Sequence, residues 1–231
     1  MDIGKAFSFI FEDPEWVTKI LIGGLVILGA VLLSPILVGF FFVFVIMGYG
    51  IDLLKNVRDG VDRPLPAWDQ WGDRAIKGLK LFVILVVWSL PSIILSVISG
   101  IISAIAGNNS DLQGLVALVS ICTGCVSFIW GILLALAYPA IYKGFAQTEE
   151  ISSGFRFGGI LAFTQKNLGD IIVAILIGLV AGLVAAVAGT ILCLIGLLFT
   201  AFWASTVQMH LYGQIARRSD AAPASPSPII S

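Results

Sequence analysis

Residues 171–216 read IIVAILIGLVAGLVAAVAGTILCLIGLLFTAFWASTVQMHLYGQIA, a run of 46 residues without Asp, Glu, Lys or Arg. A helix needs about 20 apolar residues to cross the hydrocarbon core of a bilayer, so this run must cross twice. Glycine and threonine interrupt the apolar pattern at residues 188–190. We therefore expect spanning helices over 170–188 and 190–216, joined by a tight turn between them.

Two more uncharged runs lie in the middle of the chain, at residues 81–110 and 112–142. Turn-forming residues lie where the two runs meet, at Gly107-Asn108-Asn109-Ser110-Asp111. This segment is too short for anything but the loop of a helical hairpin. The expected spans are 80–106 and 112–142. Their internal prolines, Pro91 and Pro139, predict kinks.

The first uncharged run covers residues 20–51 and has Pro35 near its centre. As a single helix it would be much longer than the bilayer is thick. Splitting it at the proline gives spans 16–33 and 36–54, each near the lower length limit for a crossing. A full hairpin and a re-entrant pair both remain open for this run.

The composition fits these long apolar runs. The chain has 231 residues, of which 58% are hydrophobic and 12% charged, whereas soluble domains carry roughly 25% charged residues. Thirteen Lys and Arg against fourteen Asp and Glu leave no basic excess for nucleic acid, and three cysteines cannot form a secreted disulfide framework. We expect one polytopic membrane domain over 1–218, followed by a disordered cytoplasmic tail over 219–231, which is rich in Pro, Ala and Ser.

The positions of the basic residues set the expected topology. All thirteen fall on one side if the first run turns back at Pro35, whereas a single crossing would move Lys5 and Lys19 to the other side. Lys and Arg accumulate in cytoplasmic loops, which favours the first arrangement. We therefore expect an all-α integral membrane protein with about six transmembrane helices in three hairpins. It would lie in the plasma membrane with both termini cytoplasmic.

Short amphipathic segments precede the outer hairpins, over residues 3–10 and 157–164. We expect both to form helices at the membrane surface. Residues 20–23 match residues 175–178 at an offset of 155, which suggests an internal repeat of surface helix plus hairpin. Residues 73–80 would be a third, weaker copy.

The largest polar segment, residues 52–80, contains Trp68, Asp69 and Trp71. The two indoles lie one helical turn apart, after two prolines that enforce an extended entry. One interpretation is an element that docks a partner or gates a path at the cytoplasmic face. The other, which we favour, is an anchor, because tryptophans commonly occupy the headgroup layer and set the depth of a helix.

His210 is the only histidine and lies near the cytoplasmic end of the last predicted span. An ionisable group in a span can carry a proton or line a solute path, and Tyr138, Tyr49 and Gln208 are further candidates for such a path. We favour a structural role for the histidine, because polar residues one to two turns from Arg217 are close to the membrane surface and cost little there.

Small residues recur at Gly178, Gly182, Ala185 and Gly189, which predicts a face for close helix packing within the chain or between subunits. Residues 122–125 have CxxC spacing but no second cysteine pair or histidine nearby, and we favour close helix packing, which suffices to explain them, over a metal or redox site. The sequence has no Ser/His/Asp arrangement, glycine-rich phosphate loop or metal-ligand cluster. We therefore expect no enzyme activity, no cofactor and no metal site.

The sequence resembles an uncharacterised family of prokaryotic multispanning membrane proteins, domain of unknown function 4013. The resemblance rests on Gly48-Tyr49, Leu65-Pro66-Ala67-Trp68-Asp69, Gly72, Gly78, Leu90-Pro91, residues 155–167, Cys193-Leu194-Ile195-Gly196 and Tyr212-Gly213-Gln214. The final third also distantly resembles membrane domains fused to glycerophosphodiester phosphodiesterases. The resemblance implies a bacterial or archaeal plasma membrane, no assigned activity and no catalytic residues.

The leading functional expectation is a non-enzymatic scaffold or subunit of a membrane assembly that acts through helix packing. Its partners would be the lipid bilayer and either a second copy of the chain or other membrane subunits, with no nucleic acid. The alternative is a carrier or channel for a small solute or lipid. A third expectation is a sensor, in which the loop of Trp68 and Asp69 relays the state of the membrane to a cytoplasmic partner.

Overall fold

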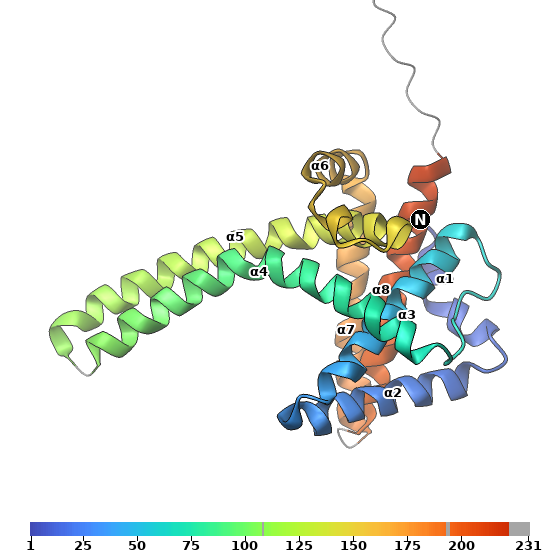
Figure 1. Cartoon of the computed structure of the whole chain (residues 1–231), viewed down its shortest axis with the longest axis horizontal. Coiled ribbons are helices and arrows are strands. Elements are labelled where there is room, and N and C mark those ends of the chain that lie inside the picture. Colours follow the sequence, from blue (N-terminus) through green and yellow to red (C-terminus); the bar gives the residue numbers. More distant parts are fainter. Residues whose placement is uncertain (108, 193–194, 222–231) are drawn as a thin grey trace, which may run out of the picture.

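The computed structural model describes residues 1–107, 109–192 and 195–221, and no β-strand occurs among them (Figure 1). The α-helices are α1 (Ile3–Ser8), α2 (Trp16–Leu33), α3 (Gly39–Asp59), α4 (Trp71–Ala106), α5 (Ser110–Thr148), α6 (Phe157–Lys166), α7 (Leu168–Ile191) and α8 (Gly196–Ala221). Short 3-10 turns lie at Phe9–Glu12, Ser34–Ile36 and Ile151–Phe155. Parts of three sequence features lie outside the described residues: Asn108 in the predicted hairpin loop, Cys193-Leu194 in the family resemblance, and residues 222–231 in the predicted tail.

The helices begin and end where the side chains satisfy free backbone groups. The Asp2 side chain accepts from the Lys5 N–H at the start of α1, and the Asn109 side chain does the same for Asp111 at the start of α5. Gly60 ends α3 with a φ of 77°, a left-handed conformation that glycine adopts without strain. These local signals fix helix boundaries at the charged end of the molecule, for α1 and α3, and at the far end of α5.

Helices α2, α3, α7 and α8 pack into a bundle, in which α3 contacts α4 and α8, and α7 runs alongside α8 (Figure 1). Helices α4 and α5 leave the bundle together as a long two-helix projection, which we call the arm. The core lies where α3 and α8 meet the adjoining ends of α4 and α5, and it includes Leu54, Leu81, Ile141, Phe145 and Leu211.

Glycines set the closest helix crossings in the bundle. A methyl group on Gly78 of α4 would overlap the backbone carbonyl of Phe44 in α3, and one on Gly48 of α3 would overlap the carbonyl of Arg74. The two backbones therefore touch directly at this crossing. Small residues allow such close approach between membrane helices.

Five of the described helical segments are long and apolar enough to cross a membrane: Trp16–Ile36, Gly39–Asp59, Trp71–Ala106, Ser110–Thr148 and Leu168–Ile191. The prediction of an all-α membrane protein is therefore confirmed at the level of fold class. α8, which covers most of the predicted span 190–216, is not among the five. Within the first uncharged run, α2 ends at Leu33 and α3 begins at Gly39, so the break falls at the expected Ser34-Pro35.

The predicted turn at residues 188–190 is wrong, because α7 continues to Ile191. Gly189 makes a helix contact there instead of a turn, since a methyl group on it would overlap the backbone of Leu197 in α8. The Thr190 hydroxyl donates to the Ala186 carbonyl one turn earlier, which is compatible with an unbroken helix. The connection to α8 therefore lies after Ile191, several residues later than predicted.

Two other local expectations change. Residues 73–80 do not form a separate surface helix, because α4 runs unbroken from Trp71 through them, so they are no third copy of the proposed repeat. The first amphipathic segment forms α1 and the turn after it, but its apolar side packs on α8, with Ala6 and Ile10 buried. The second amphipathic segment forms α6, as expected.

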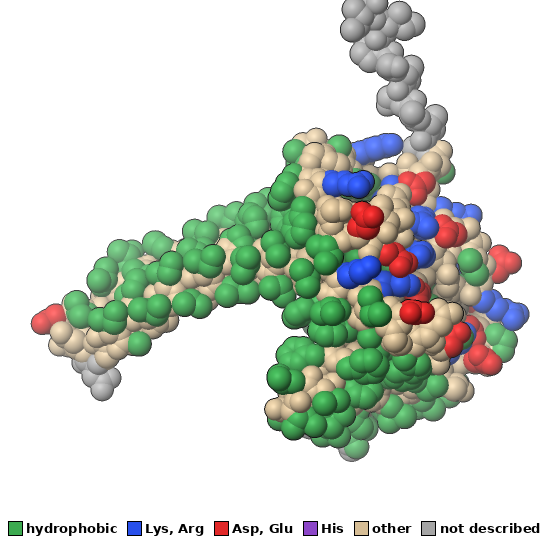
Figure 2. Space-filling model, in the orientation of Figure 1, with side chains coloured by type: hydrophobic (Ala, Val, Ile, Leu, Met, Phe, Trp, Pro, Cys, Tyr) green, Lys and Arg blue, Asp and Glu red, His purple; other side chains and the backbone are tan. Residues whose placement is uncertain are grey.

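Charged side chains gather at one end of the bundle, whereas the arm is covered by apolar side chains and shows a single acidic group at its far end (Figure 2). The sequence agrees, since Asp111 is the only charged residue between Lys80 and Lys143. The charged end is therefore where polar chemistry is concentrated, and it contains most of the candidate residues.

Candidate functional site

A loop over residues 61–70 joins α3 to α4, and neighbouring helices hold it by its backbone carbonyls. The Asn56 amide donates to Pro64 (2.8 Å), Lys19 Nζ donates to Leu65 (3.1 Å), and the Tyr49 hydroxyl donates to Pro66 (3.1 Å), all three accepting through their main-chain oxygens. Leu65 is itself buried. Three successive carbonyls are thus bonded to side chains of α2 and α3, which explains why an irregular segment can be packed here.

Trp68 points inward from this loop. Its indole stacks on the Tyr49 ring, with centroids 4.5 Å apart and an interplanar angle of 19°, and its Nε1 donates to the Lys19 carbonyl at 2.9 Å. Phe202 of α8 contacts both rings, with its centroid 5.7 Å from that of the indole and 5.4 Å from that of Tyr49. Trp71 is placed by Trp68, because its Nε1 donates to the Trp68 carbonyl at 3.2 Å. Trp68 therefore joins the loop to α2, α3 and α8.

Asp69 accepts hydrogen bonds from the buried guanidinium of Arg74. Arg74 Nη1 donates to the Asp69 carbonyl (2.8 Å), Nη2 donates to the Asp69 carboxylate (3.3 Å), and Nε donates to the Asp52 carboxylate (2.9 Å). Lys77 also pairs with Asp52. The Arg74 side chain is only 5% exposed, whereas that of Asp69 is 61% exposed. The arginine therefore links the loop to α3 with little competition from water.

Glu149, just after α5, joins the same set of charges. Its carboxylate accepts from Lys55 of α3 at 2.7 Å and lies 3.4 Å from Lys77 of α4, and its carbonyl accepts from Lys80. Partial burial raises the pKa of Glu149, but the hydrogen bond from Lys55 and the charge of Lys77 outweigh it, so that the pKa lies below its ordinary value. Residues 52, 55, 69, 74, 77 and 149 form what we call the charge clamp.

The sequence did not single out five members of the clamp, Asp52, Lys55, Arg74, Lys77 and Glu149. A signal was available in the sequence, because Asp52 and Lys55 directly follow one uncharged run, and Arg74 and Lys77 come shortly before the next. Both pairs flank the segment that contains Trp68 and Asp69. The inward position of Trp68 agrees better with an anchor than with a docking element. The contacts differ from the expected ones, since the indole packs on protein groups of α2, α3 and α8.

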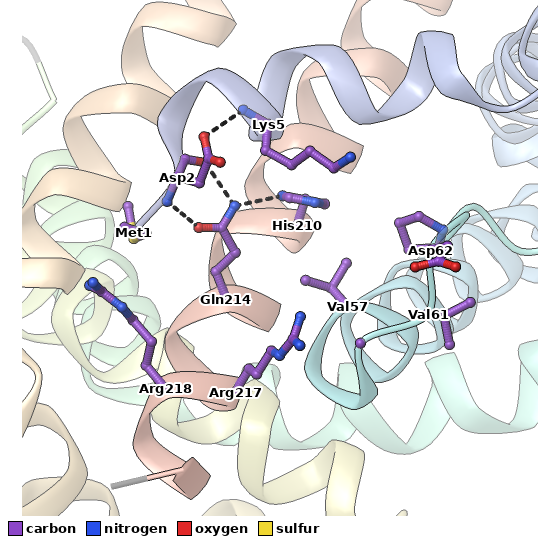
Figure 3. A pocket seen from close by; sticks show the side chains of 12 residues that line it. Met1, Asp2, Lys5, Val57, Val61, Asp62, His210, Gln214, Arg217 and Arg218 are labelled. Atoms are coloured by element: carbon purple, nitrogen blue, oxygen red, sulfur yellow. Dashed lines mark hydrogen bonds between the residues drawn. The ribbon is translucent and has the colours of Figure 1, made fainter.

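His210 lies outside the clamp, in a cavity of about 490 Å³ between α1, α8 and the segment that ends α3 (Figure 3). Phe9 stacks on the imidazole, with centroids 4.1 Å apart, and the histidine is 4% exposed. Lys5, Asp62, Arg217 and Arg218 also line this cavity. The histidine is therefore fixed by packing and adjoins a polar opening.

Gln214 determines which ring nitrogen of His210 bears the proton. Its Oε1 accepts from the Asp2 N–H (2.7 Å) and its Nε2 donates to the Asp2 carbonyl (2.8 Å), which fixes the orientation of the amide. The same Nε2 lies 3.2 Å from His210 Nδ1. Because an amide nitrogen can only donate, Nδ1 accepts and the proton of the neutral ring is on Nε2. Figure 3 shows these bonds.

Tyr138 belongs to a third location, on α5. Its ring centroid lies 6.3 Å from that of Tyr142, which in turn is 5.8 Å from Tyr212 of α8. Tyr49 is fully buried beneath Trp68. Gln208 packs against Gly178 of α7. Tyr49 and His210 thus lie in sets of contacts separate from that of Tyr138.

Three of the four residues in the predicted small-residue face of α7 lie against α8 or are buried. Methyl groups on Gly178 and Gly189 would overlap residues of α8, and Ala185 is buried. The fourth predicted residue, Gly182, has open space beside it. The neighbouring Ala181 is fully buried and belongs to the packing face instead. Of the two, Ala181 is on the side of α7 that faces α8. Among the described residues, no group of three His, Cys, Asp or Glu is arranged to hold a metal ion.

The family comparison covers most of these features. The family described as "Protein of unknown function (DUF4013)" matches residues 31–194. The chain belongs to the DUF4013 family. In this DUF4013 protein the match includes the Gly48 and Gly78 crossing, the loop with Trp68, the charge clamp and the arm, whereas His210 lies beyond it. No curated protein and no solved structure matches the chain, so the resemblance to glycerophosphodiester phosphodiesterase membrane domains is not shown.

Proposed function

We propose that this DUF4013 protein is a non-enzymatic scaffold or subunit of a membrane assembly, and that the arm is the part that binds other membrane helices. The observation that carries the proposal is the isolation of α4 and α5. In the most apolar stretch of 18 residues in α5, no residue is buried inside the protein. In the corresponding stretch of α4, only 11% of the residues are buried. The two helices pack on each other and leave the bundle (Figure 1).

Small residues on the arm support a protein partner in addition to lipid. Gly100 on α4, and Gly114, Gly124 and Gly131 on α5, have no atom within 4 Å of the position where a side chain would begin. In membranes, glycine at a helix surface allows another helix to approach closely. The arm therefore offers several unfilled contact positions, whereas Gly23, Gly48 and Gly78 in the bundle are already filled by neighbouring groups.

The charge distribution supports the proposed topology. The charged end carries nearly all Lys and Arg side chains in view (Figure 2), and cytoplasmic faces of membrane proteins collect such residues. Asp2 and Gln214 are bonded to each other at this end. We infer that both ends of the described chain lie on the cytoplasmic side of the plasma membrane, with the tip of the arm on the opposite side.

Disulfide crosslinking in native membranes tests the scaffold proposal. Cys122 and Cys125 are exposed on the arm, so a Cys193→Ser variant retains cysteines only there. If a second copy is the partner, mild oxidation should give a covalent dimer, and Gly124→Leu should reduce its yield severalfold by blocking close approach. Gly182→Leu is the matched control, since this glycine of α7 also has open space beside it but lies off the arm.

The readouts separate assembly from folding. Both leucine variants should insert and melt like the parent, because at both glycines no atom lies within 4 Å of the position where the side chain would begin. A solubilised particle with the mass of one chain, without crosslinks and without a copurifying membrane protein, would contradict the proposal. Equal loss of crosslinking in the two variants would also contradict it, because the arm would then have no special role.

A second candidate function is the carriage of a lipid. An apolar cavity of about 420 Å³ lies between α6 and the base of the arm, lined by residues that include Trp88, Trp130, Phe157 and Leu161. Both indoles use their N–H groups on backbone carbonyls, at Gly154 and Trp88, and thus present apolar faces to the cavity. Lipid exchange between reconstituted vesicles that falls in Leu161→Trp, with folding retained, would favour this candidate.

A further inference from the structure

We propose that the cavity beside His210 binds a phosphate group, as inorganic phosphate or as the headgroup of an anionic phospholipid. The cavity is distinct from the arm and from the charge clamp, and it goes beyond the scaffold function. Its volume of about 490 Å³ is ample for such a group. The contacts of His210 and Arg217 carry the proposal.

His210 supplies a directed donor. Gln214 occupies Nδ1, so the neutral imidazole carries its proton on Nε2. Nε2 has no hydrogen-bond partner among the described residues, although the histidine is 4% exposed. Figure 3 shows the second ring nitrogen on the side away from Gln214, with the ring on the cavity lining. Nε2 itself is accessible from the cavity, so its N–H is free to donate to an acceptor there.

Arg217 supplies the charge. It lies seven residues after His210 on α8, which places both on one face of the helix. Its guanidinium approaches Gly60 at the end of α3 and has no ion pair among the residues that the structure describes. Arg218 and Lys5 line the same cavity but are paired, with Asp170 at 3.0 Å and Glu12 at 2.5 Å. Among the described side chains that line the cavity, Arg217 is thus the cation without an ion pair.

The ligand is an anion with oxygens in several directions. The basic side chains on the lining come from α1 and α8, and a phosphate can accept from more than one of them because its oxygens point in several directions. Two carboxylates also line the cavity, Asp2 and Asp62, but Asp2 is occupied as the cap of α1. When paired groups are counted as well, the three basic side chains Lys5, Arg217 and Arg218 outnumber these two carboxylates. The cavity is at the charged end of the bundle, where the phosphates of a surrounding bilayer would lie.

Nitrogen NMR of the histidine ring tests the proposal directly, because His210 is the only histidine of the chain. The protein would be purified without a histidine tag in a maltoside detergent, which contains no phosphate. The expected spectrum is that of a neutral ring protonated at Nε2. Titration with inorganic phosphate, and separately with short-chain phosphatidic acid, should shift the Nε2 signal saturably at constant ionic strength.

Two variants of equal charge loss identify the site. Arg217→Gln should weaken the titration about tenfold or more, since a hydrogen bond to a charged group contributes about 1.5–3 kcal/mol. Arg156→Gln removes an exposed arginine at another cavity and should leave the affinity within about twofold. Neither substitution touches the packing of His210 with Phe9.

The outcomes are distinguishable. A response to both titrants supports recognition of the phosphate group itself. A response to phosphatidic acid alone supports a lipid headgroup, and a response to inorganic phosphate alone supports a soluble ligand. A ring protonated at Nδ1, no saturable shift with either titrant, or equal weakening by the two arginine variants would overturn the proposal.

Discussion

The indole of Trp68 lies nearly parallel to the ring of Tyr49, with centroids 4.5 Å apart and 19° between the planes. The other neighbours of the tyrosine include the Arg74 guanidinium, 5.3 Å from its centroid, and Phe202 of α8. One buried aromatic ring thus contacts the loop, α4 and α8 together. The loop is consequently part of the folded bundle, and damage to it should be measurable as a loss of stability.

Trp68→Ala should destabilise the protein by about 3 kcal/mol, because it removes the stack on Tyr49 and the bond to the Lys19 carbonyl. Trp71→Ala should cost clearly less, since the bond of Trp71 to the Trp68 carbonyl is its one polar contact among the described residues. Unfolding by sodium dodecyl sulfate in mixed micelles measures both values. The reverse order would show that Trp68 is not the main attachment of the loop.

Gly78→Ala should lower the melting temperature markedly, because the new methyl group would overlap the Phe44 carbonyl and push α3 from α4. Gly72→Ala, near the start of the same helix, has open space and should be neutral or stabilising by about 0.5–1 kcal/mol. Thermal unfolding in detergent compares the pair. Similar melting temperatures for the two variants would mean that the α3 and α4 backbones do not touch.

Arg74→Met should cost about 3 kcal/mol, because it leaves Asp52 with a single partner and Asp69 with none in the charge clamp. Arg218→Met is the control, since its pair with Asp170 is exposed and should contribute at most about 1 kcal/mol. Arg74→Lys should recover only part of the loss, because lysine lacks the fork that reaches both carboxylates. Full recovery by lysine would show that charge alone matters.

The ion pairs of Glu149 with Lys55 and Lys77 should be sensitive to acid. Its folded-state pKa lies below the ordinary value of 4.5, so its ion pairs stabilise the protein at neutral pH, and this stabilisation is lost as the pH falls through the lowered pKa. Glu149→Gln should therefore lower stability at pH 7 and narrow its difference from the parent below about pH 4. Melting curves between pH 3 and pH 7 measure the difference. A constant difference across that range would contradict the assignment.

Single cysteines at Ser34, Asn109 and Ile195, introduced into a cysteine-free chain, test the topology. Under the proposed arrangement all three should react with a membrane-impermeant maleimide added to intact cells, because they lie at the ends of the helix pairs away from the charged end. A cysteine at Arg63, in the loop before α4, should be protected until the cells are opened. Labelling of Arg63→Cys in intact cells would overturn the arrangement.

Helix boundaries followed from the sequence wherever a polar or conformational signal was strong. Pro35 sits in the break between α2 and α3, and the cluster around Asn109 marks the end of the arm. The turn at 188–190 failed because glycine and threonine are also compatible with a membrane helix, where a hydroxyl can bond to the preceding turn. Composition alone does not distinguish a turn from a close contact.

The packing face and the charge clamp show what a single sequence omits. Gly182 and Ala181 both fit helical spacing from Gly178, and only the position of α8 decides that Ala181 is the buried one. The clamp joins Asp52, Arg74 and Glu149 from segments far apart in the chain. Such pairing depends on how α3 and α4 cross, which the uncharged runs do not specify.

The bonds between Asp2 and Gln214 connect residues separated by 212 positions, and Phe9 likewise rests on His210. During translation α1 is made long before α8 exists. It must therefore wait undocked until nearly the whole described chain has been synthesised. A ribosome stalled before α8 would carry a chain with a complete arm but without the cavity beside His210. This cavity is therefore the last part of the described structure to form in the cell.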